Sequence, residues 1–187
     1  LAASTLGGNL TVTSSGAITQ TGALSVTGTS SFTVSSANAM TLTNTSNSFT
    51  GAVTLSSGTG AVQLTDSSDT ILAASTLGGN LTVTSSGAIT QTGVLSVAGT
   101  SSFTVSGSNA MTLTQANTFT GAVTLSSGTG AVQITDSSTL ILAASTLGGD
   151  LTASADNGLT INGDLTTTGN MTLDGELDNI STGTLTI

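Results

Sequence analysis

The chain repeats itself. Residues 1–71 return almost unchanged as residues 72–141, and a third copy then begins. The string Leu-Ala-Ala-Ser-Thr-Leu-Gly-Gly starts at Leu1, Leu72 and Leu142, so the period is 71 and then 70 residues. An internal repeat of this kind is typical of solenoids and arrays, in which each unit buries its apolar face against the next. Such a chain more often supplies length and surface than a single active centre.

Apolar and polar residues alternate with a period of two in short runs along the unit. In the run 10–13, Leu and Val fall on one face and two Thr on the other, as in a half-buried β-strand. Val and Thr favour strands because branching at Cβ suits the pleat. Gly, Ser, Asn and Asp cluster between the runs and indicate turns. The side chains predicted to face a common core are Leu10, Val12, Ile18, Leu24, Val26, Phe32, Val34, Met40, Leu42, Val53, Leu55, Val62 and Leu64.

The spacing of these runs predicts a coil that bends at each corner. Nine strand-like segments occur in the first unit, near residues 10, 18, 24, 32, 40, 49, 53, 62 and 71. Three strands per coil would give three coils per unit, with the segment 72–79 as a connector. The predicted fold is an all-β, right-handed parallel β-helix (β-solenoid) of about three short strands per coil and roughly eight coils.

We expect residues 1–187 to form one continuous solenoid segment of a longer protein, with repeats 1–71, 72–141 and a divergent, more acidic 142–187. The two complete copies differ in ways that suit this fold. Leu64 becomes Ile134, a volume-conserving change fit for an inward position. Residues 44–47 shorten by one residue to 115–117, which predicts a surface turn there.

Composition excludes several classes of function. The chain has no Lys, Arg, His or Cys, and its nine carboxylates give a net charge of −9. Without cations it cannot neutralise phosphates, so nucleic acid is not expected as a partner. Soft-metal sites lack their ligands, and acid–base catalysis would rest on carboxylates alone. No apolar run approaches the length of a transmembrane segment, ~18 residues, and no signal peptide is recognisable.

Two kinds of known protein resemble the chain. The phrases at residues 10–22 and 117–125 are similar to repeats of filamentous-haemagglutinin-type adhesins and autotransporter-type passenger proteins. That resemblance implies a right-handed β-helix, secretion to the bacterial surface, and a role in adhesion or biofilm. It supplies no catalytic residues. The phrase at residues 163–175 is instead similar to shaft repeats of phage tail fibres, which implies an intertwined trimer.

The carboxylates offer two candidate sites. Asp174, Glu176 and Asp178 are close in sequence and could bind Ca²⁺, a cation that requires several oxygen ligands. A solvated turn explains the same residues more simply. Asp66 and Asp69 form the one close acidic pair inside the repeat and could serve a glycoside hydrolase. The second copy keeps only the first of them, so we expect no enzyme and no cofactor.

The phrase Gly148-Gly149-Asp150 is the nearest approach to the calcium-binding repeat of exported toxins. Its other copies carry uncharged Asn9 and Asn80 at the third place. The Gly pair also resembles no phosphate loop, because no Lys follows.

Repeated Thr and Asn residues give further candidates. Outward Thr pairs, spaced by one residue, could order water and bind ice, although they do not recur on every predicted coil. The asparagines could stack as amide ladders between coils or serve turns. The Thr pairs are Thr11/Thr13, Thr41/Thr43, Thr82/Thr84 and Thr112/Thr114, and the asparagines are Asn38/Asn109 and Asn47/Asn117.

Together these features predict a structural, non-catalytic shaft or filament segment of a secreted bacterial surface adhesin or extracellular fibre. The expected partners are further copies, joined end to end or laterally, and surface glycans. Two alternatives stay open: a trimeric phage-type fibre shaft, and a β-solenoid that binds glycan or ice.

Overall fold

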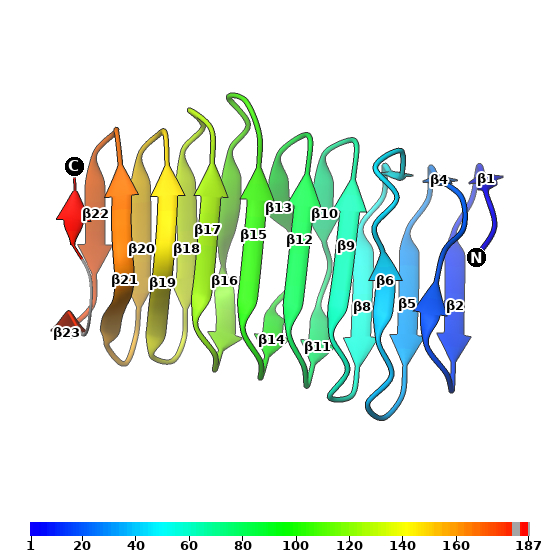
Figure 1. The fold of residues 1–187 in the computed structure, drawn as a ribbon, viewed down its shortest axis with the longest axis horizontal. Coiled ribbons are helices and arrows are strands. Elements are labelled where there is room, and N and C mark those ends of the chain that lie inside the picture. The colour runs from blue at the N-terminus through cyan, green and yellow to red at the C-terminus, as the bar shows by residue number, and fades with distance from the viewer. Residues whose placement is uncertain (181–183, 187) are drawn as a thin grey trace.

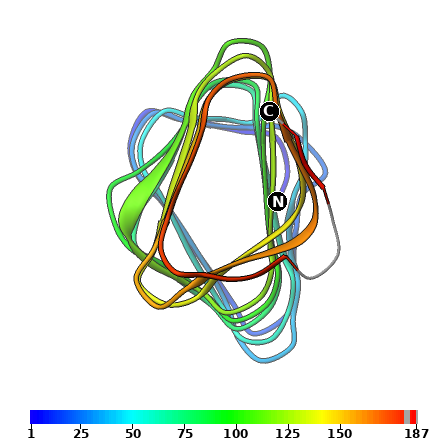
Figure 2. The same ribbon diagram turned by 90° about the vertical axis from the view of Figure 1, so that its left-hand side faces the viewer.

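The chain winds into a β-solenoid whose two ends lie far apart. The computed structural model describes residues 1–180 and 184–186, which form about nine turns and, within those ranges, no helix. Strands run across the long axis, with the N-terminus at one end and the C-terminus at the other (Figure 1). The cross-section is roughly triangular (Figure 2). The winding in Figure 1 is right-handed, as parallel crossovers almost always are.

All strand pairings in the described residues are parallel, and they form three sheets. The smallest sheet holds three strands: β1 (Ser4–Leu6), β4 (Leu24–Val26) and β7 (Ser48–Phe49).

The largest sheet holds eleven strands: β2 (Leu10–Ser14), β5 (Ser30–Val34), β8 (Val53–Ser57), β10 (Thr70–Leu72), β11 (Ser75–Leu77), β13 (Ile89–Gln91), β14 (Leu95–Val97), β16 (Met111–Phe119), β18 (Val132–Asp136), β20 (Leu151–Ala155) and β22 (Met171–Asp174). It spreads over two sides of the coil, because β8 pairs with both β10 and β11.

The third sheet holds ten strands: β3 (Ile18–Thr19), β6 (Met40–Leu42), β9 (Val62–Asp66), β12 (Leu81–Ser85), β15 (Ser101–Val105), β17 (Val123–Ser127), β19 (Leu140–Leu147), β21 (Leu159–Thr167), β23 (Leu177–Ile180) and β24 (Leu185–Thr186). Its strands β9 to β21 stand side by side along the front of Figure 1.

The repeat does not contain a whole number of coils. From β1 to β13 every strand except β7 pairs with the third strand after it, as in β2–β5–β8–β11–β14 and β3–β6–β9–β12–β15. The copy of β1 is β11, ten strands later. Ten strands at three per coil make three and one-third coils. Equivalent residues of successive repeats therefore lie on different sides of the solenoid, one-third of a turn apart.

This corrects the prediction of nine strands and three coils per repeat. The missed strand is β1, with its copy β11, inside the segment 72–79 that we had expected to be a connector. The Ser-Thr-Leu part of that segment has one apolar residue and shows no alternation of apolar and polar residues, and Ala and Gly flank it. The strand forms because neighbouring coils offer pairing partners: β11 lies between β8 and β14.

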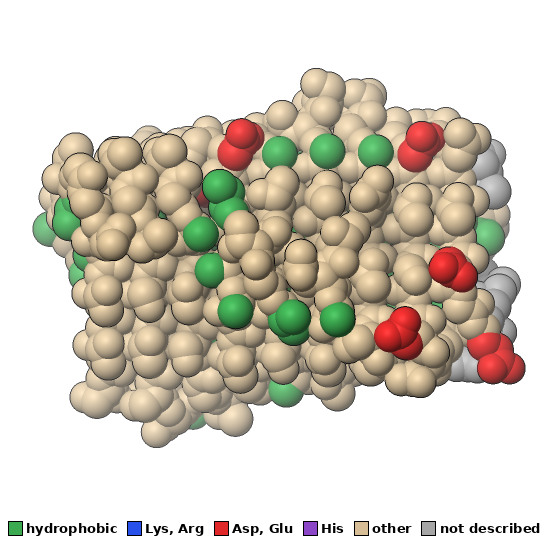
Figure 3. Space-filling model, turned by 180° about the vertical axis from the view of Figure 1, so that it is seen from behind, with side chains coloured by type: hydrophobic (Ala, Val, Ile, Leu, Met, Phe, Trp, Pro, Cys, Tyr) green, Lys and Arg blue, Asp and Glu red, His purple; other side chains and the backbone are tan. Residues whose placement is uncertain are grey.

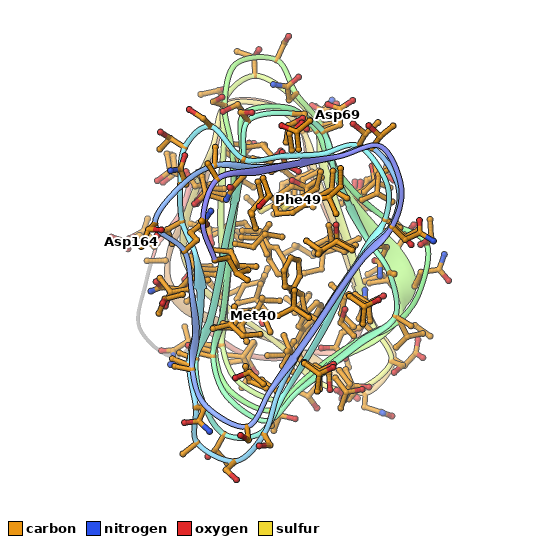
Figure 4. The ribbon with its side chains drawn as sticks, turned by 90° about the vertical axis from the view of Figure 1, so that its right-hand side faces the viewer. Met40, Phe49, Asp69 and Asp164 are labelled. Atoms are coloured by element: carbon orange, nitrogen blue, oxygen red, sulfur yellow. The ribbon has the colours of Figure 1, made fainter. Side chains whose placement is uncertain are left out.

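Apolar side chains fill the interior from end to end. In the view along the axis, Met40 and Phe49 point into the core while Asp69 and Asp164 point outward (Figure 4). Phe32 and Phe49, from adjacent coils, meet edge to face at 5.9 Å between ring centroids. Their copies Phe103 and Phe119 repeat the contact at 5.9 Å. This is a favourable geometry for aromatic pairs.

Of the thirteen side chains predicted to face the core, the structure buries eleven and leaves Leu10 and Val12 half-buried. These two belong to the first coil, which has a neighbouring coil on one side only in the described residues. Their copies Leu81 and Val83 have coils on both sides and are buried. The half-exposure therefore follows from position along the axis and not from sequence.

A glycine at a corner of the solenoid shows how closely the coils stack. A Cβ added to Gly28 would lie 2.6 Å from the backbone carbon of Gly8 in the preceding coil, which leaves room for glycine alone.

The shortening of the second copy falls next to exposed residues Thr45 and Ser46, as predicted for a surface turn. The adjoining Asn47 is fully buried, however, so the turn is not wholly at the surface.

Candidate functional site

A row of hydroxyl side chains crosses seven consecutive coils on the third sheet. Each member is the direct ladder partner of the next, and each of the first six is half-buried or exposed and adjoins at least one buried apolar residue of its own strand. The row is Thr65, Thr84, Thr104, Ser126, Thr146, Thr166 and Thr186. Partners on neighbouring parallel strands are ~4.8 Å apart, so the row is a regular file of small groups that both donate and accept hydrogen bonds.

A second row runs beside the first. It comprises Thr41, Gln63, Thr82, Ser102 and Thr124, two residues earlier on each shared strand. Together the two rows form a grid of hydroxyls spaced ~4.8 Å along the axis and ~6.7 Å along each strand. One Gln interrupts it. Such a surface can hydrogen-bond neutral polar partners, including sugars and ordered water, without charge.

Of the Thr pairs singled out in the sequence, only Thr82/Thr84 lies wholly in this grid, and Thr41 belongs to its second row. Thr11 and Thr13 lie on β2, whereas their copies Thr82 and Thr84 lie on β12 in a different sheet. The two pairs lie on different sides of the solenoid because each repeat ends one-third of a turn beyond a whole number of coils. Serines and threonines from other parts of the repeat fill the intervening places, so the rows recur on coils where no Thr pair was expected.

Inside the solenoid, Asn47 joins three successive coils. Its side-chain amide pairs with that of Gln20 through two hydrogen bonds of 2.8 and 2.9 Å. Its Oδ1 also accepts the N–H of Leu24 at 2.9 Å, and its Nδ2 donates to the carbonyl of Thr65 at 3.1 Å. Asn117 repeats the arrangement with Gln91, Leu95 and Thr135.

These contacts bear on the expected asparagine ladders. An inter-coil amide pair exists, but the partner of each Asn is a Gln, which sequence reasoning missed. The sequence did indicate a role for this glutamine, because Gln20 is repeated as Gln91 at the same position of the second copy. Asn38 and Asn109 instead are half-buried and donate to carbonyls of Ser15 and Ser86 in the preceding coil, at 2.7 and 2.8 Å.

Asp66 is a buried carboxylate beside this amide. It accepts hydrogen bonds from the N–H and hydroxyl of Ser68 at 3.0 and 2.8 Å and from the N–H of Phe49 at 3.3 Å. Burial raises the pKa of Asp66 above its ordinary value, and these hydrogen bonds oppose part of that rise. Its copy Asp136 is also fully buried and accepts from Ser138 and Phe119.

Other carboxylates close corners between coils. Asp69 accepts the N–H of Ala88 at 2.8 Å, and Asp150 accepts that of Asn170 at 2.7 Å. Asn9 and Asn80 do the same as Asp150 in the other copies, each at 2.9 Å from a backbone nitrogen. The third place of the Gly-Gly-Asp phrase thus needs a side-chain oxygen, which either residue supplies.

The candidate calcium ligands are only partly described. Asp174 lies 3.5 Å from the hydroxyl of Ser154, Glu176 is exposed, and the side chain of Asp178 lies outside the described residues. The described residues contain no group of three or more carboxylates suited to a metal ion. In the rear view each acidic side chain lies apart from the others on a surface of mostly uncharged polar groups (Figure 3).

Comparison with known proteins identifies the repeat. One family model, described as repeats of unknown function (DUF5649), matches residues 1–56, 59–126 and 129–186. The chain belongs to this family. The DUF5649 match covers the solenoid almost from end to end, in three segments whose limits differ from the sequence period. Searches of curated proteins and of solved structures found no match. Among the residues described there is no membrane-spanning helix.

Proposed function

We propose that this DUF5649 chain is a non-enzymatic, load-bearing segment in the shaft of a secreted bacterial surface adhesin or extracellular fibre. The observation that carries the proposal is the stacking: parallel ladders link each coil to the next from β1 to β24. Hydrogen bonds on every side of a coil point along the axis and share an axial load. Each coil also covers the apolar face of its neighbour, so the rod resists local opening.

The surface suits an exposed filament. Nine carboxylates and no cation give every copy the same sign of charge, which disfavours lateral collapse of neighbouring shafts. The remaining surface is rich in Ser and Thr hydroxyls that stay hydrated. A secreted, cell-surface location, with adhesion or biofilm as the biological role, is the setting in which these properties are useful.

Antibodies raised against residues 1–187 test the proposal on intact bacteria that express the native protein. Immunogold electron microscopy is expected to label thin extracellular filaments along their length. Label confined to the cytoplasm, or to globular particles, would contradict it. Light scattering of the purified chain decides against the trimeric phage-type alternative if the particle has the mass of one chain, whose own strands already form all sides of each coil.

The hydroxyl grid favours a second candidate, a glycan- or ice-binding face. Thr104 lies in the middle of the seven-coil row, and Gln133 is a comparable outward residue on another sheet. Thr104→Lys is expected to abolish thermal hysteresis or glycan-array binding, and Gln133→Lys to preserve it. Absence of both activities in the unmodified chain rejects this candidate and leaves the shaft proposal intact.

A further inference from the structure

The seven-coil hydroxyl row on the third sheet, here called the third-sheet row, has a copy on another side of the solenoid. The copy crosses six consecutive coils on β2, β5, β8, β11, β14 and β16 of the largest sheet, and each member is the ladder partner of the next. This largest-sheet row is Thr13, Thr33, Ser56, Thr76, Ser96 and Thr118. In Figure 1, β5, β8 and β16 run downward, opposite to β9, β12 and β15, because the chain returns on another side of each coil.

The one-third turn of each repeat produces this copy. Thr33 of the largest-sheet row returns one repeat later as Thr104 of the third-sheet row. Ser56 returns in the same way as Ser126. The same stretch of sequence therefore presents its hydroxyls on a new side each time it is repeated.

The neighbouring row of the grid is copied too. Beside the largest-sheet row, two residues earlier on β2, β5 and β8, lie Thr11, Ser31 and Thr54. Their copies in the second repeat are the grid members Thr82, Ser102 and Thr124. Two hydroxyl grids of the same design thus face different directions, and they are called the largest-sheet grid and the third-sheet grid.

The hydroxyls of the two long rows are available to a partner. Every member is half-buried or exposed. Within the part of the chain that the structure describes, Thr118 alone among them makes a side-chain hydrogen bond, to Ser137 at 3.5 Å. Each of the other hydroxyls can both donate to a bound molecule and accept from it.

The surface around the grids is almost free of charge. From residue 1 to residue 149 the one ionisable side chain that is not buried is Asp69, since Asp66 and Asp136 are fully buried. A charged polymer would find no opposite charge here to replace its hydration. The hydroxyls of an uncharged polymer, in contrast, can exchange their hydrogen bonds with water for hydrogen bonds with the grid.

We propose that each of the two grids binds an extended, uncharged polysaccharide, so that the shaft holds neutral glycan chains on two different sides and cross-links them. The inference rests on the glycan-binding candidate of the proposed function, and it adds the number of sites and the directions they face. The largest-sheet row spans five ladder steps, which at ~4.8 Å per step is ~24 Å. Single hydrogen bonds of this kind are weak, but a straight row of them engages one extended chain at many points. Ice fits this arrangement less well, because a flat crystal surface meets one side of the shaft at a time.

A count of bound molecules tests the two sites. In equilibrium dialysis against a soluble β-1,4-glucan oligosaccharide, the unmodified chain is expected to bind two molecules. Thr33→Lys and Thr104→Lys are matched variants, because the two threonines are half-buried copies of each other in different grids. Each should halve the number of molecules bound, and the double variant should weaken binding about tenfold or more. Gln133→Lys adds the same charge at an exposed position outside both grids and should leave both sites intact.

The viscosity of a long uncharged glucan, hydroxyethyl cellulose, separates cross-linking from binding. The unmodified chain should raise the viscosity, because one chain joins two polysaccharide molecules. Thr33→Lys and Thr104→Lys should each still bind the polysaccharide but leave its viscosity unchanged, since one remaining site cannot join two molecules. Circular dichroism of each variant should match that of the unmodified chain.

Complete loss of binding in Thr104→Lys, or an unchanged number of bound molecules in Thr33→Lys, would overturn the inference and leave a single glycan-binding face on the third sheet. No binding by the unmodified chain would reject both the inference and the glycan-binding candidate. None of these results bears on whether the native protein forms labelled filaments on cells, so the shaft proposal is tested separately.

Discussion

Alanine at one glycine position of the repeat should be harmless in the first copy and damaging in the second. Gly8 and Gly79 have identical sequence neighbours, and neither has a φ in the left-handed region. Alanine is therefore conformationally acceptable at both. They differ in what surrounds them. A Cβ has open space at Gly8, but at Gly79 it lies 2.4 Å from the oxygen of Gly60 and 2.5 Å from that of Thr59.

The expected loss in the free energy of unfolding follows from the clash at Gly79. An ordinary contact needs ~3.4 Å or more, so the two coils would have to separate locally by ~1 Å. Overpacking of this kind costs ~1–3 kcal/mol, and each ladder hydrogen bond that is lost adds ~1 kcal/mol. Gly79→Ala should lower the free energy of unfolding by ~3 kcal/mol. Gly8→Ala should leave it unchanged or raise it by ~0.5 kcal/mol, because alanine restricts the unfolded chain.

Urea unfolding of both variants, followed by circular dichroism, measures the difference. Gly149→Ala is the internal check, since its Cβ would lie 2.5 and 2.6 Å from the oxygens of Gly130 and Thr129, and it should behave like Gly79→Ala. Equal effects at Gly8 and Gly79 would refute the reasoning, because they would mean that the two copies have the same surroundings and are not successive levels of one stack.

Three further substitutions test the interior, and a fourth, Asn109→Ala, serves as a control; all are measured by urea unfolding. Asn117→Ala should cost ~3 kcal/mol because it leaves buried groups of three coils unpaired, while the same change at half-buried Asn109 should cost ~1 kcal/mol; similar losses would contradict the buried network. Ser101→Ala should be neutral or stabilising by up to ~1 kcal/mol, since the Ser101 hydroxyl is buried and has no hydrogen-bond partner among the described residues. The raised pKa of Asp66 means that the unfolded chain releases this proton first, so stability should fall as pH rises from about 3.8 through the folded pKa. That fall should be absent in Asp66→Asn, and an opposite slope would show that hydrogen bonds outweigh burial.

Much of the fold could be predicted because the repeat and the alternation act locally. Val26 and Phe32 are buried by the same two-residue period that identified them in the sequence. The number of strands per repeat could not be obtained in this way. Ser4–Leu6 is too short to show alternation, and it becomes a strand because of what pairs with it.

The hydroxyl grid could not be predicted from the sequence, for the same reason. Thr84 and Thr104 are 20 residues apart in sequence and unlike in context, and only the coil length makes them ladder partners. A single missed strand changes which residues meet on every later coil. The buried amide pair of Gln20 and Asn47, 27 residues apart, also depends on that register. Local propensity predicts where the strands lie in the sequence. The stacking of the coils decides which side chains become neighbours on the surface.

One distance tests the stacked coil most directly. Thr65 and Thr166 are 101 residues apart in sequence but only five ladder steps apart on the third sheet, which at ~4.8 Å per step is ~24 Å. The chain has no cysteine, so spin labels can be placed at these two positions alone. Electron–electron dipolar spectroscopy should give one narrow distribution near ~24 Å. A broad distribution at much longer distances, as from separate domains strung along the chain, would contradict the account.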